Sequence, residues 1–359
     1  MMQSSPQHRD GGKSPTWQQV VAKYQNPSWQ RSLWQVINTF VPYAACLALM
    51  YVALSYSYWI VLALALPAGG LLTRIFIIFH DCGHGSFFRS KRANNILGTI
   101  CGLLVFTPYY QWRFDHAIHH ATSGDLDRRG TGDIYTMTVR EYLALSPRER
   151  FKYRVYRSPL ILLGAGPWFM FLVAQRFSSA HSRMRERASV YGTNLAIVAV
   201  LALMWATIGI KAYLLIQLPV MFVAGLAGVW LFYIQHQFEG TSWRRHEQWD
   251  YVTAALRGSS YFKLPKVLQW FTGNIGLHHI HHLSSRIPNY ALQQCMDENP
   301  MFQDVTTITL RSSLHSLRLN LWDEEAERLV SFRQVRAAQQ AHEARERVQP
   351  GGRSFPVGD

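Results

Sequence analysis

Long uncharged apolar runs alternate with very polar segments along this chain. The stretches 43–72 (YAACLALMYVALSYSYWIVLALALPAGGLL) and 194–210 (NLAIVAVLALMWATIGI) contain no charged residue. A helix needs about 20 predominantly apolar residues to cross the hydrocarbon core of a bilayer. The pattern therefore predicts four spanning helices, which we place at about 36–58, 60–79, 190–208 and 212–234.

The four predicted spans form two hairpins. Their turns are short, one at Ser55–Tyr58 and the other at 209–213 (GIKAY). Two further apolar stretches, 95–108 and 159–174, are too short to span comfortably and predict interfacial or re-entrant helices. The predicted fold class is an all-α integral membrane protein with four transmembrane helices.

Basic residues orient this arrangement. The chain has 36 Lys and Arg against 22 Asp and Glu, a net charge of +14, yet the two hairpin turns hold only Lys211. Because cytosolic loops carry the excess of Lys and Arg, we expect both turns outside and every long segment in the cytosol. A basic cytosolic face suits anionic lipid headgroups or an acidic protein partner. The membrane accounts for the charge, so no nucleic acid partner is expected.

The chain is predicted to consist of one membrane domain with polar ends. We expect a basic cytosolic arm at 1–33, the membrane domain at 34–335, and a charged helix end and disordered tail at 336–359, the helix beginning near Asp323. Residues 1–33 are polar, so no secretory leader is expected. Unpaired spacing predicts reduced thiols for the four cysteines, Cys46, Cys82, Cys101 and Cys295.

Three short clusters hold histidines at matching helical spacing: HDCGH (80–84), HAIHH (116–120) and HHIHH (278–282). Separations of three and four residues put side chains on one face of a helix, and all three clusters obey this rule when His279 is left out. The predicted topology places the three clusters on the same side of the membrane, where they would form a cytosolic histidine-rich helical cap.

The number of imidazoles in these clusters indicates two metal ions. A zinc site needs about four ligands, usually including cysteine or carboxylate, whereas sites rich in nitrogen and poor in thiolate suit redox iron. Iron can also activate O2 beside the unreactive hydrocarbon of a membrane lipid, which zinc cannot do. His236, in FYIQHQFEG (232–240), lies at the cytosolic end of the fourth span. Its position alone fits a ligand or a polar helix-end residue equally well.

These motifs resemble the histidine boxes of the integral-membrane fatty acid desaturases. HDCGHGSFF (80–88), HAIHH (116–120) and GNIGLHHIHHLSSRIPN (273–289) match the pattern H-x3/4-H, H-x2-H-H and H-x2-H-H. The resemblance is to the bacterial and cyanobacterial acyl-lipid Δ12 (ω6) group, and it covers most of the chain beyond residue 30. The three residues inside the first box are typical of the Δ12 and ω3 groups, whereas the Δ9 acyl-CoA type has four.

The resemblance implies an O2-dependent acyl-lipid desaturase of a bacterial inner membrane, with a diiron centre on the cytoplasmic side. The expected reaction is Δ12 (ω6) desaturation of oleoyl groups on lipid, with an ω3/Δ15 or Δ9 desaturase as the alternative. Hydroxylases, ketolases and acetylenases of related type stay open, because the same ligands serve those reactions. Related enzymes take one further histidine from the end of the fourth span, so the implied ligands are His80, His84, His116, His119, His120, His236, His278, His281 and His282.

Supporting residues and an electron donor are also expected. A ligating histidine usually hydrogen-bonds through its other ring nitrogen, and the nearby candidates are Asp81, Asp115, Asp125, Glu239 and Asn274, with His279 kept as a supporting or structural residue. The chain lacks a flavin or nicotinamide glycine fingerprint and the HPGG of a fused cytochrome b5. A separate donor is therefore implied, ferredoxin-like or a cytochrome b5, whose acidic surface would suit the basic face.

Aromatic residues near the boxes have two possible roles. Tyr109, Tyr110, Trp112, Trp270 and Phe271 could line an acyl tunnel or belong to the aromatic belt at the membrane surface; the belt is favoured for the two tyrosines. A transporter is disfavoured because the spans carry almost no ionisable residue apart from Arg74. A zinc protease of the H-E-x-x-H type is disfavoured because HDCGH lacks the glutamate.

Overall fold

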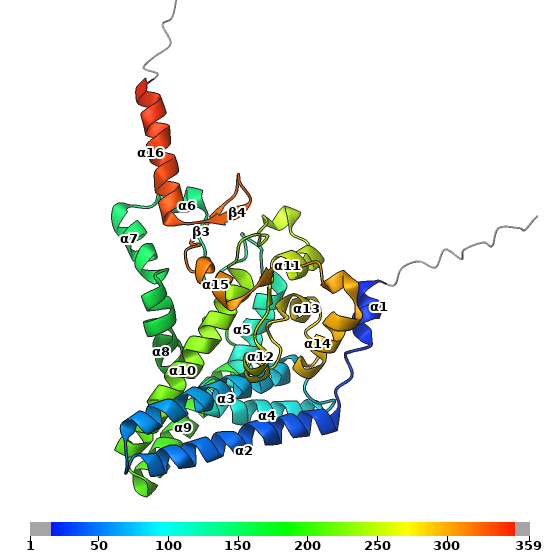
Figure 1. Cartoon of the computed structure of the whole chain (residues 1–359), viewed down its shortest axis with the longest axis vertical. Coiled ribbons are helices and arrows are strands. Elements are labelled where there is room, and N and C mark those ends of the chain that lie inside the picture. The colour runs from blue at the N-terminus through cyan, green and yellow to red at the C-terminus, as the bar shows by residue number, and fades with distance from the viewer. Residues whose placement is uncertain (1–15, 349–359) are drawn as a thin grey trace, which may run out of the picture.

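The computed structural model describes residues 16–348. Two of the arginine and lysine residues of the predicted basic arm, Arg9 and Lys13, and the predicted disordered tail at 349–359 lie outside this part. Long helices form the lower half of the molecule and short helices form a cap above them, while one helix, α16, stands away from the cap (Figure 1). The predicted all-α fold class is confirmed.

Within residues 16–348, four helices are long and apolar enough to cross a membrane, as predicted. They are α2 (Trp29–Ala53), α3 (Tyr58–His84), α9 (Met184–Thr207) and α10 (Ile210–His236). The first begins earlier than the predicted start at 36, since the Ser28 side chain caps it by accepting a hydrogen bond from the Arg31 amide. The second and fourth extend past their predicted ends, so that they carry histidines on their last turns.

Helices α3 and α10 pack closely in the membrane region. A side chain at Gly69 of α3 would place its Cβ only 2.5 Å from Cβ of Val223 on α10. Small residues permit this approach of two backbones, which matters in a bilayer because lipid is as apolar as the helix surfaces. The pair therefore sets the position at which both helices deliver their C-terminal histidines to the cap.

The shorter apolar stretch near residue 100 forms α4 (Lys91–Leu104), which packs along α3. Its inner face buries Asn94, Gly98 and Cys101, whereas Ile96 and Ile100 are exposed. This amphipathic division is typical of an interfacial helix. All four cysteines are free thiols, in agreement with the prediction.

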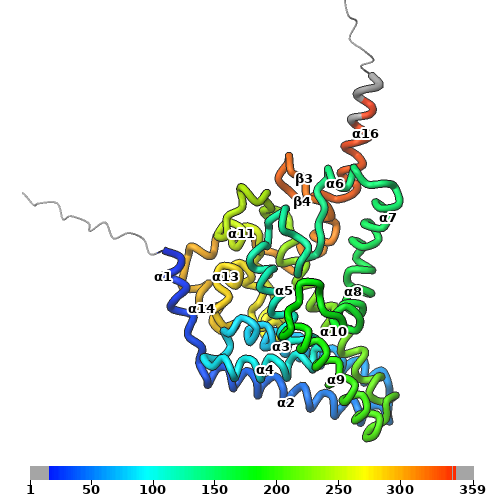
Figure 2. The backbone as a smooth tube through the Cα atoms, turned by 180° about the vertical axis from the view of Figure 1, so that it is seen from behind, coloured from blue at the N-terminus to red at the C-terminus, as the bar shows by residue number. Residues whose placement is uncertain are grey.

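The second short stretch forms an irregular helix, Leu160–Arg176, with α8 (Gly166–Trp168) at its centre. It follows α7 (Pro147–Tyr156) at a bend of 53°. The Arg176 carbonyl accepts a hydrogen bond from Asn194, ten residues inside α9, at 2.9 Å. The segment thus runs along α10, where Pro167 lies against Gly225, and meets α9 at Arg176. The chain then turns back to Met184, where α9 begins, as a re-entrant segment does. Figure 2 shows this segment from behind.

The cap is built from short elements. These are α1 (Trp17–Ala22), α5 (Tyr109–Thr122), α6 (Val139–Ala144), a 3-10 turn (His246–Gln248), α11 (Tyr251–Arg257), β1 (Tyr261–Phe262), α12 (Lys266–Phe271), α13 (His278–Leu283), α14 (Asn289–Glu298), a second 3-10 turn (Pro300–Phe302), β2 (Thr307–Ile308) and α15 (Leu310–Ser316). Strands β1 and β2 pair in parallel, Tyr261 opposite Thr307.

Residues 16–28, part of the predicted basic arm, pack onto this cap. Val20 and Val21 of α1 are buried in one apolar cluster with Ile280 and Leu292. The Tyr24 hydroxyl donates a hydrogen bond to Glu298 at 2.6 Å. The N-terminal segment therefore covers the outer side of the helix that carries the third histidine cluster.

The prediction of a charged helix from about Asp323 is wrong. Residues 321–330 form an antiparallel hairpin of β3 (Leu321–Asp323) and β4 (Arg328–Val330), and the helix, α16 (Phe332–Val348), begins only after it. Burial on both faces of the hairpin explains the difference: Trp322 and Leu329 pack into one apolar cluster, and Leu321 and Val330 pack into another. The charged residues between the strands form the turn.

A buried arginine joins the re-entrant segment, the fourth span and the C-terminal hairpin. Arg157 is 1 % exposed and donates hydrogen bonds to the Thr136 hydroxyl (3.0 Å), the Gln237 side chain (3.0 Å) and the Leu319 carbonyl (2.9 Å). A buried polar group is costly only when it lacks partners. These bonds therefore tie three distant segments into one unit.

We expect Arg157→Ala to lower the apparent Tm of the purified protein by about 5 °C or more, because several buried acceptors lose their donor. Thermal unfolding followed by size-exclusion fluorescence measures this shift. Arg140→Ala is the matched control, since Arg140 is exposed on α6. Equal Tm values for the two variants would contradict the role given to Arg157.

Candidate metal centre

The first histidine pair lies on the last turns of α3. His80 and His84 are four residues apart and their ring centroids are 4.7 Å apart, so both point to the same side of the helix. The helix stops at Gly85, whose φ of +72° is left-handed and whose amide bonds back to the Cys82 carbonyl at 3.0 Å. The spanning helix therefore presents the pair directly at the cap.

Helix α5 brings the second cluster opposite this pair. Tyr109, 1 % exposed, donates a hydrogen bond from its hydroxyl to the Cys82 carbonyl at 2.7 Å. Its ring lies against Gly98, where a Cβ would come within 2.2 Å of it. Tyr109 thus fixes α5 onto α3 and α4 from a buried position, and the predicted place in an interfacial belt does not fit its burial.

Trp112 lies directly beside the histidines of the first group. Its indole stacks on the His116 ring with centroids 4.2 Å apart and planes 19° apart. The same ring lies 4.7 Å from the Phe79 ring and against Gly83 of α3, where a Cβ would be 2.8 Å away. Trp112 therefore forms part of the apolar wall next to the first box.

The third cluster lies on the short helix α13. Before it, Asn274 has a left-handed φ of +59° and donates a hydrogen bond from its side chain to the Asn289 carbonyl at 3.0 Å. His279 lies outside the space shared by the other rings and donates to the Phe302 carbonyl at 3.1 Å. Burial lowers the pKa of His279 to about 4.

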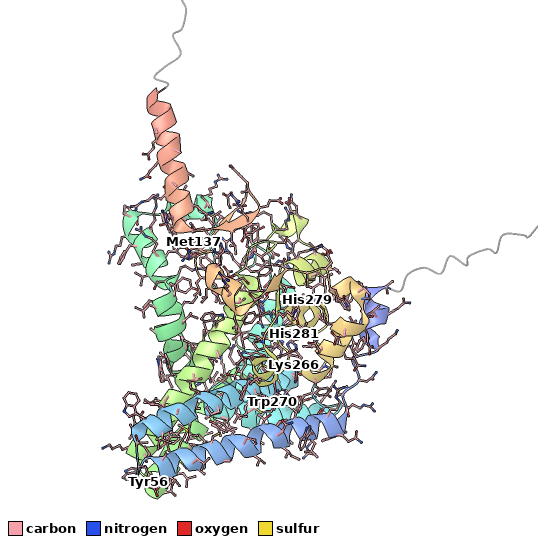
Figure 3. All side chains as sticks on the ribbon, viewed as in Figure 1. Tyr56, Met137, Lys266, Trp270, His279 and His281 are labelled. Atoms are coloured by element: carbon pink, nitrogen blue, oxygen red, sulfur yellow. The ribbon has the colours of Figure 1, made fainter. Side chains whose placement is uncertain are left out.

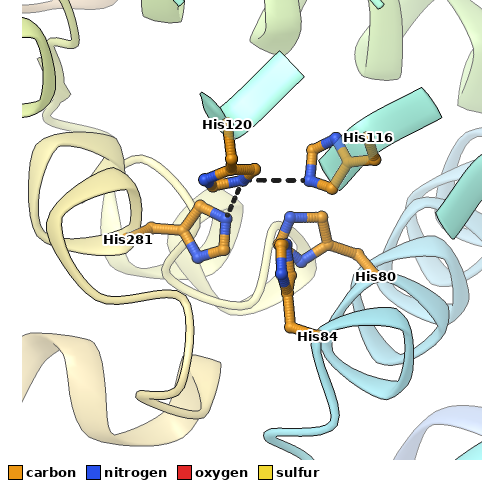
Figure 4. Close-up of side chains that lie close together, drawn as sticks. All are labelled: His80, His84, His116, His120 and His281. Atoms are coloured by element: carbon orange, nitrogen blue, oxygen red, sulfur yellow. Dashed lines mark hydrogen bonds between the residues drawn. The ribbon is translucent and has the colours of Figure 1, made fainter. Parts of the chain in front are cut away.

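The nine predicted histidines come together as two groups. Within each group the nearest ring nitrogens all lie within 4.8 Å of one another. The first group is drawn from α3, α5 and α13, and its five rings surround one centre in Figure 4. The second is drawn from α5, α10 and α13. The first group is His80, His84, His116, His120 and His281; the second is His119, His236, His278 and His282.

The distances within the groups fit metal ligands. His236 Nε2 lies 3.2 Å from His119 Nε2 and 3.0 Å from His278 Nε2. One ring nitrogen can carry one proton, so it cannot make a full hydrogen bond with each of two other nitrogens of the same kind. Two nitrogens bound to one ion at about 2.1 Å would be roughly 3.0–3.4 Å apart. The convergence therefore suits a shared ion better than hydrogen bonding.

Unpartnered buried nitrogens lead to the same conclusion. Nε2 of His84 and Nε2 of His282 have no hydrogen-bond partner in the part of the chain that the structure describes. Orphaned polar atoms of this kind are rare in folded proteins. Neither group includes a cysteine, so the donor set is all imidazole.

Burial keeps the cap histidines neutral. It is the largest cause that lowers the pKa well below the usual range for five of them, and the neighbouring imidazoles lower it further. These are His116, His120, His278, His281 and His282. A neutral imidazole has a free lone pair. At physiological pH these rings are therefore in the form that binds a metal ion.

Acceptors on α3, in a loop and at the end of α5 orient three of the histidine rings. Asp81 accepts a hydrogen bond from His80 Nδ1 at 3.1 Å and, through its other oxygen, from the Asn289 amide at 2.7 Å. His119 Nδ1 donates to Asp133 at 2.6 Å. His236 Nδ1 lies 3.3 Å from the Ser123 hydroxyl. Such bonds select the tautomer that points Nε2 at the metal.

Three of the predicted supporting residues lie elsewhere. Asp115 bonds to Gln111 at 2.9 Å, and burial raises its pKa. Asp125 accepts from His246 at 2.8 Å within the following loop. Glu239 is exposed and lies 4.0 Å from His315. Proximity in sequence suggested all three, but none of their side chains hydrogen-bonds to a histidine of the two groups.

Sequence reasoning missed Asp133, the carboxylate with the shortest contact to a box histidine. It is 14 residues from His119 in a loop, and no helical spacing connects the two. The preceding Gly132 is the one available signal. Its φ is +70° and a Cβ there would lie 3.0 Å from the Cβ of His119, so the loop needs glycine to approach the helix.

Fold and site together define a class: a helical membrane protein with two imidazole groups at one end of its spans that could hold metal ions. Residues 57–304 match the family described as Fatty acid desaturase. The chain is 50% identical to a fatty acid desaturase of Bacillus subtilis over 316 residues, covering 88% of this chain and 90% of that protein.

More distant relatives agree with this match. An omega-6 fatty acid desaturase of Arabidopsis thaliana chloroplasts is 28% identical over 66% of this chain and 52% of its own length. An sn-1 acyl-lipid omega-3 desaturase (ferredoxin) of Synechocystis sp. is 27% identical over 64% of each chain. The chain belongs to the fatty acid desaturase family, and it is an oxidoreductase.

Asp133→Ala should weaken metal binding about 10- to 100-fold, because His119 loses the acceptor that orients it. Titration of the metal-free protein with Fe²⁺ or Co²⁺ measures the change. Asp127→Ala, which removes an exposed carboxylate from the same loop, is the control. An affinity for Asp133→Ala equal to that of the control would show that the contact has no part in the centre.

Proposed function

We propose that this protein inserts a cis double bond into the acyl chain of a membrane lipid at a centre of two iron ions. The observation that carries the proposal is the pair of imidazole groups, five rings and four, at the C-terminal ends of α3 and α10. Iron fits a donor set made of imidazole alone, with no thiolate. The family matches support the reaction class.

The reaction balances as a dehydrogenation. One O2 takes two hydrogens from adjacent acyl carbons, together with two electrons and two protons from outside, and leaves as two waters. Bound iron would supply the oxidation of the C–H bonds by O2, a chemistry that no side chain of this chain supplies. The protein's own part is to bind the ions, orient the rings and position two carbons.

Different elements of the chain carry out these tasks. Neutral rings on α5 and α13 supply lone pairs without a change of protonation. Asp81 and Asp133 hold the ring orientations from opposite sides. Trp112, stacked on His116 and packed on Phe79, supplies an apolar surface next to the first group. An apolar surface there suits a hydrocarbon chain and excludes water.

The proposed position of the new double bond is Δ12 (ω6), on oleoyl groups. A relative named as an omega-6 desaturase supports it, and the three-residue spacing inside HDCGH fits the ω6 and ω3 groups alike. An ω3/Δ15 or Δ9 position and a hydroxylated product are the competing outcomes. The position of the double bond depends on how deeply the acyl chain enters the site. A shift of the acyl chain by one methylene group changes that position.

A separate protein supplies the electrons in this proposal. A ferredoxin-like donor is favoured over cytochrome b5, because one relative is named as a ferredoxin-dependent enzyme. The net charge of +14 favours an acidic donor. Reconstitution of the purified enzyme should therefore use reduced ferredoxin first and cytochrome b5 second.

Expression in a host that contains both saturated and oleoyl lipids, with a ferredoxin system, should yield a diene at Δ12. His281→Ala should abolish the product, because it removes a ring of the first group. His315→Ala is the control, since this histidine is exposed and outside both groups. Mass spectrometry of the extracted fatty acids locates the double bond.

Each outcome of that experiment decides one part of the proposal. A double bond at another position keeps the chemistry and rejects Δ12. An added oxygen atom indicates a hydroxylase. Absence of any product, together with purified protein that binds no iron, overturns the proposal as a whole.

The proposed location is the cytoplasmic membrane of a bacterium, with the centre on the cytoplasmic side. Lys211 is the only charged residue in the two hairpin turns, and every arginine except Arg74 lies outside the predicted spans and their turns. A reporter that is active only in the cytosol should be active when it is fused after the last residue. A reporter that is active only outside the cytosol should be active when it is inserted at Ser57. The reverse pattern would invert the orientation.

A further inference from the structure

One ionisable side chain in a spanning helix has no role in the metal centre. Arg74 lies on α3 and is 7 % exposed. Its Nε donates to the Thr39 hydroxyl of α2 at 3.1 Å, and its Nη1 donates to the Trp270 carbonyl of α12. The Trp270 ring covers the guanidinium at 4.1 Å.

The charge of Arg74 is not compensated within the protein. No carboxylate lies within 4.0 Å of it among residues 16–348. Its second terminal nitrogen, Nη2, has no acceptor in the same part of the chain. A buried charge is costly unless it is paired, and an ionisable residue inside a membrane span usually marks a site of function. The missing partner should therefore be an anion from outside the chain.

The surroundings of Arg74 show where that anion would come from. Helix α12 presents an apolar surface, with Val267 68 % and Leu268 39 % exposed. This surface suits the membrane interface. Lys266 is exposed and lies four residues before Trp270, hence on the same face of the helix. Figure 3 shows Lys266 and Trp270 one above the other, between His281 and the long helices.

We propose that Arg74, with Lys266 beside it, binds the phosphate of a membrane glycerophospholipid whose acyl chain is the substrate. A guanidinium offers several N–H donors in a planar fork that matches phosphate oxygens. The partly exposed Trp270 completes the site at the depth of the headgroups. This inference rests on the proposed function and adds the substrate class to it.

The position of Arg74 on α3 gives the contact a consequence for the reaction. Arg74 and His80 are six residues apart on one continuous helix, which is about 9 Å along its axis. A lipid held by its phosphate at Arg74 therefore has its acyl chain measured from a fixed point on the same rigid element that carries the first box. The site selects which carbons reach the centre.

The alternative is that Arg74 only clamps α12 onto α2 and α3. A clamp predicts loss of stability without any change in lipid binding or in product. A phosphate site predicts loss of bound phospholipid, and a wider spread of double-bond positions in the product that remains. Lipid binding and product position therefore separate the two roles.

The test measures phospholipid bound to the protein purified without iron, by native mass spectrometry and by exchange in nanodiscs. Wild-type protein should retain one phospholipid in preference to an uncharged diacyl glycolipid. Arg74→Gln should reduce this retention about tenfold or more, and Lys266→Gln several-fold. Arg140→Gln, an exposed arginine on α6, is the control and should retain lipid like the wild type.

Every result supports or rejects the site. Retention by Arg74→Gln equal to that of the control, or equal binding of the uncharged glycolipid by the wild type, overturns it. If Arg74→Gln does not fold, the exposed Lys266→Gln decides by the same criterion. Because binding is measured without iron, a loss of lipid in the variants would stand even if the protein proved not to be a desaturase.

Discussion

Nine imidazole rings packed into one buried space constrain every element around them. Each ring must stay neutral and must present one particular nitrogen, which requires burial around the rings and acceptors behind them. The acceptors come from three places: Asp81 lies next to His80 on a spanning helix, Asp133 lies in a loop, and Ser123 lies at the end of α5. The fold of the cap brings these acceptors into contact with the rings.

Helix α3 carries residues of the first histidine group and of the proposed phosphate site. Its last turns carry His80 and His84, and two turns earlier it carries Arg74, the buried cation beneath Trp270. Tyr109 fixes α5 against it and Gly69 allows α10 to approach it. A rigid spanning helix can relate a position at the membrane surface to a position in the cap more reproducibly than loops can. Oxidation of a chosen pair of carbons needs such a fixed relation.

The spans and the histidine sets could be predicted because both depend on local periodicity. Twenty apolar residues in a row suffice to indicate a membrane helix, and separations of three and four residues suffice to place His116, His119 and His120 on one face. The spacing also separated His279 from its neighbours, and the structure turns that ring toward Phe302. Helix ends were less predictable, because α3 and α10 continue beyond the apolar core on polar residues.

The contacts between distant segments left little signal in the sequence, Gly132 being the one available for Asp133. Asp133 reaches His119 only because Gly132 lets a loop approach the helix, and Asp125 and Glu239, which are close to boxes in sequence, point elsewhere. The division of the rings into groups of five and four splits the neighbours His119 and His120 between two groups. Periodicity and residue type determined the membrane class and the candidate metal ligands, since both are local properties. The grouping of the rings, their acceptors and the partnerless Arg74 arise from packing between distant segments, which only the tertiary structure decides.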